Sequence, residues 1–191
     1  MNSEIYKPGE TAIVVVDVQA PFYSGFPGIP ESFPDFPDSI RRFLSAAREK
    51  GFRICHLNQE SLSGKDKWLD NWYRKNGNDW SCDIVAGNIE EFAAPAAGEP
   101  IFVKHDFDGF SCPQFPAYLE RHGIKSLIIV GLLATICVHY TAISAYMRGF
   151  PTAIIDECVA DRSKEKFEAL KTLTGHLFDF VKLDEFLSVQ T

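Results

Sequence analysis

The sequence predicts an α/β protein in which helices cover both faces of a mostly parallel sheet of six strands. Short apolar runs alternate along the 191 residues with segments whose apolar residues have helical spacing. The first run, TAIVVV, is continuous and β-branched, which is typical of a strand covered on both faces. The six runs expected to form strands are residues 11–16, 52–57, 100–104, 126–130, 152–155 and 178–183.

Helices are predicted between the strands from caps and apolar spacing. Asp38 can cap a helix that runs through Lys50, and Gly51 follows at the position that ends many helices. A helix that opens near Cys137 should end at Gly149 for the same reason. The other expected helices are residues 115–122 and 163–174.

The stretch from residue 58 to 99 has the weakest pattern. It contains Trp68, Trp72 and Trp80, several Asn and Gly residues, and a weak helical signal only at residues 88–92. A long insert inside a compact domain is usually a lid or a wall of a binding site. A proline-rich loop at residues 25–37 is expected to fold over the same edge of the sheet.

The composition restricts the classes of function. The net charge is -7 and basic residues are scattered, so a nucleic-acid partner is not expected. No apolar run is long enough to span a membrane, and the N-terminal residues show no secretory signal, so we expect one cytoplasmic domain. The five cysteines include no CxxC pair and are expected to be free thiols.

Three reactive side chains follow predicted strands. Asp17, Lys104 and Cys137 each lie just beyond the carboxyl end of a strand, where open α/β sheets bind ligands. Taken singly, such residues are more often a cap, a solvated lysine and a packed thiol. Together, a thiol, an acid and an amine suffice for a covalent hydrolase.

The surroundings of Cys137 favour a nucleophile. Thr135 can cap the helix, which would place Cys137 in the first turn, where the helix dipole favours a thiolate. Backbone N–H groups of the turn at residues 133–137 could stabilise an oxyanion. Asp17 could carry the proton to the leaving nitrogen, while Lys104 keeps that carboxyl ionised or stabilises the thiolate.

Three blocks of sequence resemble the isochorismatase-like cysteine hydrolases, which include nicotinamidases, N-carbamoylsarcosine amidohydrolase, and ureidoacrylate and biuret hydrolases. The blocks are VVVDVQAPF, IFVKHDFDGF and IIVGLLATICVHYTAISAYMRGF. Their order and spacing match the family over most of the chain. The resemblance implies that residues 1–191 form one such domain, a six-stranded parallel sheet between helices, which commonly assembles into homodimers or homotetramers.

The resemblance also implies roles for single residues. Cys137 would be the nucleophile, Asp17 the general base and acid, and Lys104 its electrostatic partner. The amides of Leu133 and Cys137 would form the oxyanion hole, with a cis peptide bond between Leu132 and Leu133.

Departures from the family narrow the reaction. Nicotinamidases carry an Asp-x-His metal motif where this chain has Asn58 and Glu60, so neither a metal nor another cofactor is expected. Isochorismatases lack the nucleophile, so Cys137 favours cleavage of a C–N bond in a small amide or ureido compound. A non-catalytic binding or regulatory protein, and an isochorismatase-type ether hydrolase, are the alternatives. The expected substrate-binding residues are Gln19, Phe22, Asn58, Phe107, Phe110 and Tyr140.

Overall fold

Six parallel strands form one twisted sheet in the computed structural model, which describes residues 2–26, 28–62, 64–77 and 84–188. Their order across the sheet is β3-β2-β1-β4-β5-β6. The predicted α/β fold is therefore confirmed. The strands are β1 (Thr11–Val16), β2 (Arg53–Gln59), β3 (Ile101–Lys104), β4 (Ser126–Leu132), β5 (Thr152–Ala160) and β6 (Asp179–Val181).

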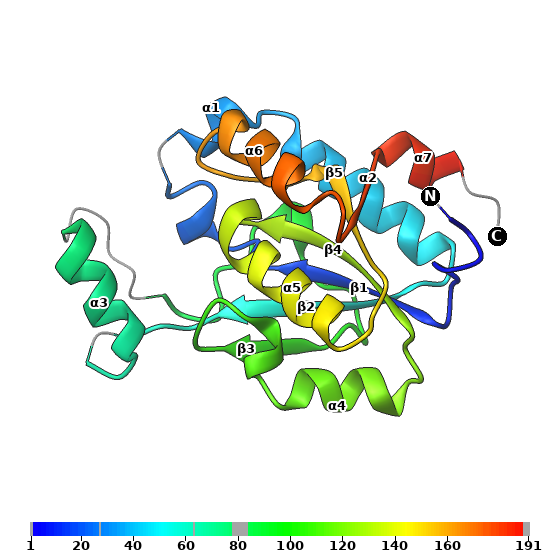
Figure 1. The fold of residues 1–191 in the computed structure, drawn as a ribbon, viewed down its shortest axis with the longest axis horizontal. Coiled ribbons are helices and arrows are strands. Elements are labelled where there is room, and N and C mark those ends of the chain that lie inside the picture. The colour runs from blue at the N-terminus through cyan, green and yellow to red at the C-terminus, as the bar shows by residue number, and fades with distance from the viewer. Residues whose placement is uncertain (1, 27, 63, 78–83, 189–191) are drawn as a thin grey trace.

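Helices cover both faces of the sheet, as Figure 1 shows. One layer packs the apolar residues of α2 (Phe36–Glu49) and α7 (Leu183–Ser188) against the sheet. The opposite layer is formed by α4 (Gln114–Arg121), α5 (His139–Met147) and α6 (Lys164–Thr174). No helix in the described ranges is long and apolar enough to cross a bilayer.

Both faces of the central strands are buried, which explains their continuous apolar pattern. In β1, Ile13 and Val15 face the α2 layer, while Val14 and Val16 face the α5 layer. All six residues of β1 are buried, since helices leave neither face to solvent.

The winding of the chain reverses between β1 and β4. The chain moves outward from β1 through β2 to β3, and then returns to place β4 on the other side of β1. Such a switch point leaves a crevice at the carboxyl ends of the two central strands. Asp17 follows β1 and Leu133 follows β4, so both residues lie at this point.

Several sequence predictions are wrong in detail. The second helix begins at Phe36, so Asp38 lies within its first turn and does not cap it. β5 continues five residues past the predicted end at residue 155, and the last strand ends at Val181 because Leu183 opens α7. Residues 88–92 form no α-helix. A short 3₁₀ turn, Glu91–Ala93, overlaps the end of this stretch.

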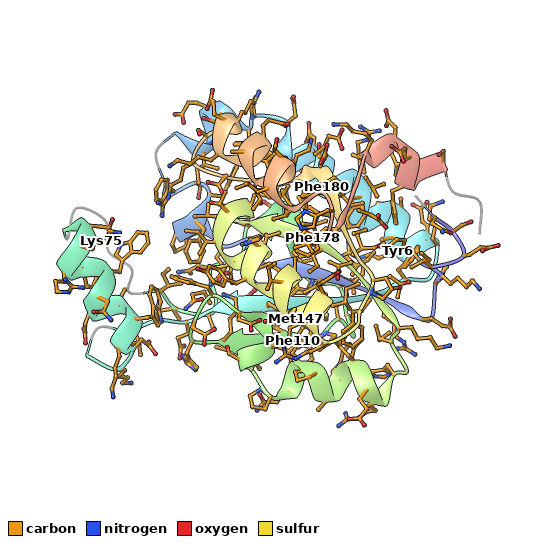
Figure 2. The ribbon with its side chains drawn as sticks, viewed as in Figure 1. Tyr6, Lys75, Phe110, Met147, Phe178 and Phe180 are labelled. Atoms are coloured by element: carbon orange, nitrogen blue, oxygen red, sulfur yellow. The ribbon has the colours of Figure 1, made fainter. Side chains whose placement is uncertain are left out.

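The insert contains a helix that the sequence pattern did not predict, α3 (Lys67–Asn76). It lies beyond the carboxyl ends of β1 and β2, with Lys75 at the edge of the molecule in Figure 2. A very short helix, α1 (Ile29–Ser32), stands in the proline-rich loop. Trp80 and Cys82 lie outside the described residues.

Gly131 is required where β4 passes β1. Its φ is +117°, and a Cβ atom built on it would lie 2.1 Å from the carbonyl oxygen of Val16. We expect Gly131→Ala to lower the free energy of unfolding by about 3 kcal/mol or more, measured by chemical denaturation.

Gly98 provides the matched control for this substitution. It also has a positive φ, +89°, but a Cβ atom there would meet nothing within 4 Å. Gly98→Ala should therefore cost only about 1 kcal/mol for the backbone conformation. Equal losses for the two variants would contradict a steric origin at Gly131.

His56 takes part in a buried polar cluster, as expected for a structural histidine. Its Nε2 lies 3.2 Å from Glu99 Oε2, while Arg48 Nε donates to Glu99 Oε1 at 2.7 Å and the Ala96 N–H donates at 2.8 Å. Burial acts to raise the pKa of Glu99, but these hydrogen bonds outweigh it and lower the pKa to about 2. The cluster therefore favours the ionised carboxylate.

We expect this cluster to stabilise the fold above pH 4.5 and to lose its effect as the pH falls toward 2. The pKa of Glu99 is lower in the folded chain than its ordinary value of 4.5, so the folded state binds fewer protons in this range. Glu99→Gln should lower the free energy of unfolding by about 1 kcal/mol at pH 7 and by less at pH 3. The exposed Glu120 gives the control, Glu120→Gln, which should change neither value.

Candidate active site

Polar and reactive residues from five strands meet at one edge of the sheet. Asp17 follows β1, Gln59 ends β2, and Lys104 ends β3. Cys137 lies in the turn after β4, and residues 161–162 follow β5. Because all strands are parallel, their carboxyl ends converge there, and the three residues predicted to react are brought together.

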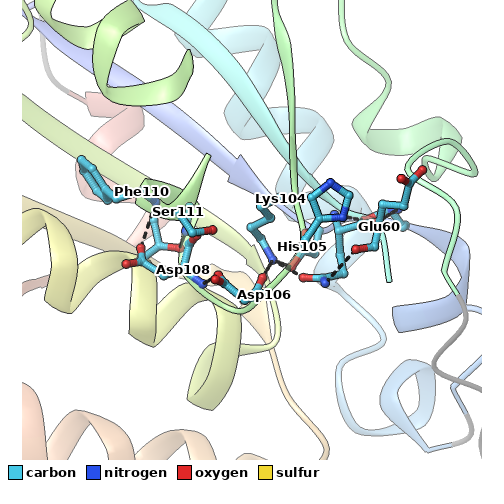
Figure 3. Close-up of polar contacts among 12 residues, drawn as sticks. Glu60, Lys104, His105, Asp106, Asp108, Phe110 and Ser111 are labelled. Carbon is cyan, nitrogen blue, oxygen red and sulfur yellow. Dashed lines mark hydrogen bonds and ion pairs between the residues drawn. The ribbon is translucent and has the colours of Figure 1, made fainter. Parts of the chain in front are cut away.

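Lys104 is fully buried and its ammonium group contacts three oxygen atoms. Its Nζ lies 2.8 Å from Asp17 Oδ2, and it donates to Gln59 Oε1 at 2.6 Å and to the carbonyl oxygen of Asp106 at 2.9 Å. Figure 3 shows the last of these contacts. Two of these contacts are hydrogen bonds and the contact with Asp17 is an ion pair, so all three partners of the ammonium lie within the protein.

The Asp17 carboxyl group is also fully buried. Its backbone has a φ of +49°, in the left-handed region that Asp tolerates better than most residues, and its N–H donates to the carbonyl oxygen of Leu57 at 2.8 Å. Burial raises the pKa of Asp17 more than the Lys104 ammonium and a hydrogen bond with Cys137 lower it. A carboxyl group with a raised pKa is suited to accept and return a proton.

Charge balance keeps Lys104 protonated. Burial acts to lower its pKa, but the nearby charges of Asp17 and Cys137 outweigh this and raise it. The cation therefore lies where it can offset negative charge on either neighbour.

The Cys137 thiol is buried beside this ion pair. It lies in a single π-helical turn, Ala134–Val138, that precedes α5. Burial raises its pKa well above the ordinary range, and Asp17 raises it further, while Lys104 acts in the opposite direction. Burial thus opposes the thiolate that the helix start is expected to favour, and attack by the sulfur requires a base.

Thr135 has a different role from the predicted helix cap. Leu133 occupies the capping position, and Thr135 instead donates through its N–H and its Oγ1 to Asp161 Oδ2, at 2.6 and 2.7 Å. The other oxygen of Asp161 accepts the Arg162 N–H at 2.7 Å. This buried carboxylate ties the turn that carries Cys137 to the end of β5.

Leu133 begins the turn that carries the thiol. The peptide bond between Leu132 and Leu133 is cis. Leu133 and Cys137 line the same pocket, so the two backbone amides assigned to an oxyanion hole belong to residues on one wall.

A narrow pocket of about 30 Å³ opens onto Cys137. This volume accommodates on the order of two water molecules. Of the predicted wall residues, Phe22 and Phe107 line it. The described lining residues are Phe22, Gln59, Trp68, Trp72, Ile84, Phe107, Leu133, Ile136, Cys137 and Arg162.

The side chains of Gln19 and Asn58, predicted to contact the substrate, form hydrogen bonds with backbone groups of neighbouring segments. The Gln19 side chain accepts the Gln59 N–H at 2.8 Å and donates to three backbone carbonyl groups. Asn58 Nδ2 donates to the carbonyl oxygen of Ala86 at 2.7 Å. These contacts hold residues 84–88 against the ends of β1 and β2, and neither side chain is among the described residues that line the pocket.

Phe110 and Tyr140 also lie away from the described pocket wall. Phe110 packs in the core against Phe115, with ring centroids 4.9 Å apart, and Tyr140 is half exposed on α5. Among the described residues that line the pocket, Tyr140 contacts Phe107, with ring centroids 5.9 Å apart.

The sequence analysis missed Gln59 and Arg162. The predicted strands end at residues 57 and 155, whereas β2 and β5 continue to Gln59 and Ala160, so the pattern does not place Gln59 or Arg162 at a strand end. Asp156 lies within β5, and its carboxylate pairs with Lys171 at 2.7 Å on the α6 side. A polar pair, Asp161-Arg162, directly after an apolar run was the available signal.

Possible metal ligands are dispersed. Within the described part of the chain, no group of three or more His, Cys, Asp and Glu side chains is arranged to hold an ion. His56 is paired with Glu99, as described above.

The fold and the site define a Rossmann-like α/β protein with a buried thiol, carboxylate and ammonium at the switch point of its sheet. The isochorismatase domain model matches residues 11–180. The chain therefore belongs to the isochorismatase family.

Individual relatives show the extent of the likeness. Maleamate amidohydrolase from Pseudomonas putida is 27% identical over 167 residues, which cover 83% of this chain and 76% of the relative. N-carbamoylsarcosine amidase from an Arthrobacter species is 29% identical over 145 residues, or 71% of this chain, which spans only 54% of that relative. The crystal structure of N-carbamoylsarcosine amidase from Thermoplasma acidophilum has a TM-score of 0.76 and 24% identity, and covers 92% of this chain and 97% of its own. At this identity, the structural likeness shows the fold.

Proposed function

We propose that this chain is a cysteine hydrolase that cleaves a C–N bond of a small amide, ureido or carbamoyl compound through an acyl-enzyme on Cys137. The observation that carries the proposal is the contact of three buried groups, the Cys137 thiol, the Asp17 carboxylate and the Lys104 ammonium, of which Cys137 lines the pocket. Burying a charged pair is costly, so its presence beside a thiol favours a chemical role.

In the first half-reaction, Asp17 accepts the thiol proton while Cys137 Sγ attacks the carbonyl carbon. The backbone N–H groups of Leu133 and Cys137 stabilise the oxyanion that forms. When the tetrahedral intermediate collapses, the C–N bond breaks and Asp17 gives its proton to the departing nitrogen. Lys104 keeps its proton throughout and offsets the negative charge at the thiolate and the carboxylate.

In the second half-reaction, water hydrolyses the thioester. Asp17 takes a proton from the water molecule while the oxygen of that water attacks the acyl carbon. The intermediate then releases the acid, and the proton returns to the sulfur. Asp17 has its original charge at the end of the cycle, as a catalyst requires.

The relatives support the class of bond. The two curated relatives are named as an amidohydrolase and an amidase, so both act on carbon–nitrogen bonds. The thiol favours the same chemistry in this chain, because a sulfur nucleophile forms a thioester with an acyl carbon.

The test is detection of the thioester. A panel of ureides, carbamoyl amino acids and small amides is mixed with the protein and quenched in acid during turnover, and the protein is analysed by intact mass and peptide mapping. We expect an adduct of the acyl group on Cys137, and the same adduct in Cys112→Ala, since Cys112 is a buried thiol outside the described pocket wall. An adduct on any other residue would contradict the proposal.

A further inference from the structure

A second buried carboxylate, Asp161, lies beside the turn that carries Cys137. β4 and β5 are neighbours in the sheet, and Leu132 pairs with Ala160 at their carboxyl ends. The next residues along the two strands are therefore Leu133, which begins the turn, and Asp161. Since Asp161 is fully buried, its carboxylate faces the backbone of the turn and not solvent.

The Asp161 carboxylate is held by neutral donors. Its Oδ2 accepts the N–H and the hydroxyl group of Thr135, at 2.6 and 2.7 Å, and its Oδ1 accepts the N–H of Arg162 at 2.7 Å. Within the described ranges of the chain it forms no ion pair. Burying a carboxylate without a cation is costly, so its presence beside the nucleophile favours a role in the reaction.

The turn at Cys137 has an unusual hydrogen-bond register. The carbonyl oxygen of Leu133 accepts the N–H of Ile136 at 3.0 Å and that of Val138 at 3.2 Å. The second bond spans five residues, as in a π-helix, whereas an α-helix would direct the N–H of Cys137 to this oxygen. The oxygen thus binds the residues on either side of Cys137. The skipped N–H is one of the two that the proposed mechanism assigns to the oxyanion.

Thr135 is the point at which Asp161 holds this register. Both donors of Thr135 bind one carboxylate oxygen, so its backbone and its side chain are fixed against the end of β5. Because π-helical turns are rare compared with α-helical ones, an added contact is needed to maintain this one. Without the carboxylate, we expect the turn to relax toward the α-helical register, in which the Cys137 N–H is occupied by the Leu133 carbonyl group.

We propose that Asp161 is a positioning residue, which holds residues 134–138 in the register that leaves the Cys137 amide free to stabilise the oxyanion. The inference rests on the proposed function, because it requires a tetrahedral intermediate on Cys137. Asp161 acts through Thr135 and needs no contact with substrate. Its loss should therefore slow acyl transfer to the sulfur without making the sulfur less reactive in other ways.

The first test compares two small reagents that attack the same sulfur atom. Iodoacetamide transfers its CH₂CONH₂ group to Cys137 Sγ with loss of iodide, a displacement at saturated carbon that forms no oxyanion. S-methyl thioacetate transfers its acetyl group: the new thioester bond forms through a tetrahedral oxyanion, and methanethiol leaves with the thiol proton. The rates of both reactions at Cys137 are measured by acid quench, intact mass and peptide mapping.

We expect Asp161→Ala to lower the ratio of the acetylation rate to the alkylation rate by about 10- to 100-fold. Thr135→Val has a similar shape and loses only the hydroxyl donor, so it should lower the ratio by about 3- to 10-fold. Thr135→Ser restores that donor and should retain most of the ratio. The two Thr135 variants keep the test valid if Asp161→Ala does not fold, which thermal unfolding reveals.

Asp156→Ala is the matched control. Asp156 is another buried carboxylate of β5, but it pairs with Lys171 at 2.7 Å on the α6 side, so its loss should leave the ratio unchanged. Equal ratios in the wild type, Asp161→Ala and Thr135→Val would overturn the inference. A parallel fall of both rates would also overturn it, because Asp161 would then position the sulfur and not the amide.

Failure of the proposed function gives a different result. Wild-type Cys137 that is alkylated but not acetylated would contradict the acyl-enzyme itself, whatever Asp161 does. Wild-type Cys137 that reacts with neither reagent would overturn both proposals.

The second test uses an amide that the wild type cleaves, with ammonia release as the measurement. The oxyanion develops only in the transition state, so we expect Asp161→Ala to lower kcat by about 10- to 100-fold and to change KM by less than about threefold. A rise in KM with kcat unchanged would show that Asp161 serves substrate binding, and would overturn the inference.

Discussion

Lys104→Met is expected to lower the free energy of unfolding by about 3 to 5 kcal/mol at pH 7 and to abolish amide cleavage. Met fills a similar volume but leaves the Asp17 carboxylate buried without its cation. An uncompensated buried charge is strongly destabilising. With the ammonium gone, the pKa of Asp17 in the folded chain should rise further above its value in the unfolded chain. The stability deficit should therefore shrink as the pH falls and Asp17 takes up a proton. Urea unfolding at pH 7 and pH 5 measures both effects.

The double variant Asp17→Asn/Lys104→Met separates the loss of a pair from the loss of packing. Asn tolerates the left-handed backbone at position 17, and no uncompensated charge remains in the double variant. We expect it to be more stable than Lys104→Met alone and still inactive. If the loss in the free energy of unfolding for the double variant equals the sum of the losses for the two single variants, the two side chains do not interact.

Cys137→Ala is expected to reduce kcat/KM for an accepted amide by about 10⁴-fold or more. The substitution removes the atom proposed to form the thioester, and the remaining groups can at most position water against the carbonyl. The fold should be retained, because the substitution removes only one buried sulfur atom. Ammonia release under saturating and limiting substrate gives kcat and KM separately.

Cys112→Ala provides the control for loss of a buried sulfur. The Cys112 thiol donates to Gln114 Oε1 at 3.1 Å, away from the described pocket wall. The activity of Cys112→Ala should therefore match that of the wild type. Ammonia release by Cys137→Ala at the wild-type rate would contradict the nucleophile assignment.

Much of the architecture could be predicted from the chain alone because its signals are local. The apolar runs at residues 11–16 and 126–130 indicate strands that are buried on both faces, and the structure bears this out. The expected end of β5 was wrong because Asp156 interrupts the apolar pattern. That residue is accommodated within the strand by a contact with Lys171, which a local pattern does not report.

The sequence by itself predicted the six strands and most of the helices between them, and it placed three candidate reactive side chains at or beyond strand ends, since both predictions depend on residue type and spacing. The tertiary structure decided which groups surround them. The contacts of the Lys104 ammonium, the loop-tying role of Gln19 and the position of Arg162 on the pocket wall each depend on residues far apart in the chain. The surroundings of the Cys137 thiol were decided in the same way, because its burial raises its pKa, and burial depends on residues far apart in the chain.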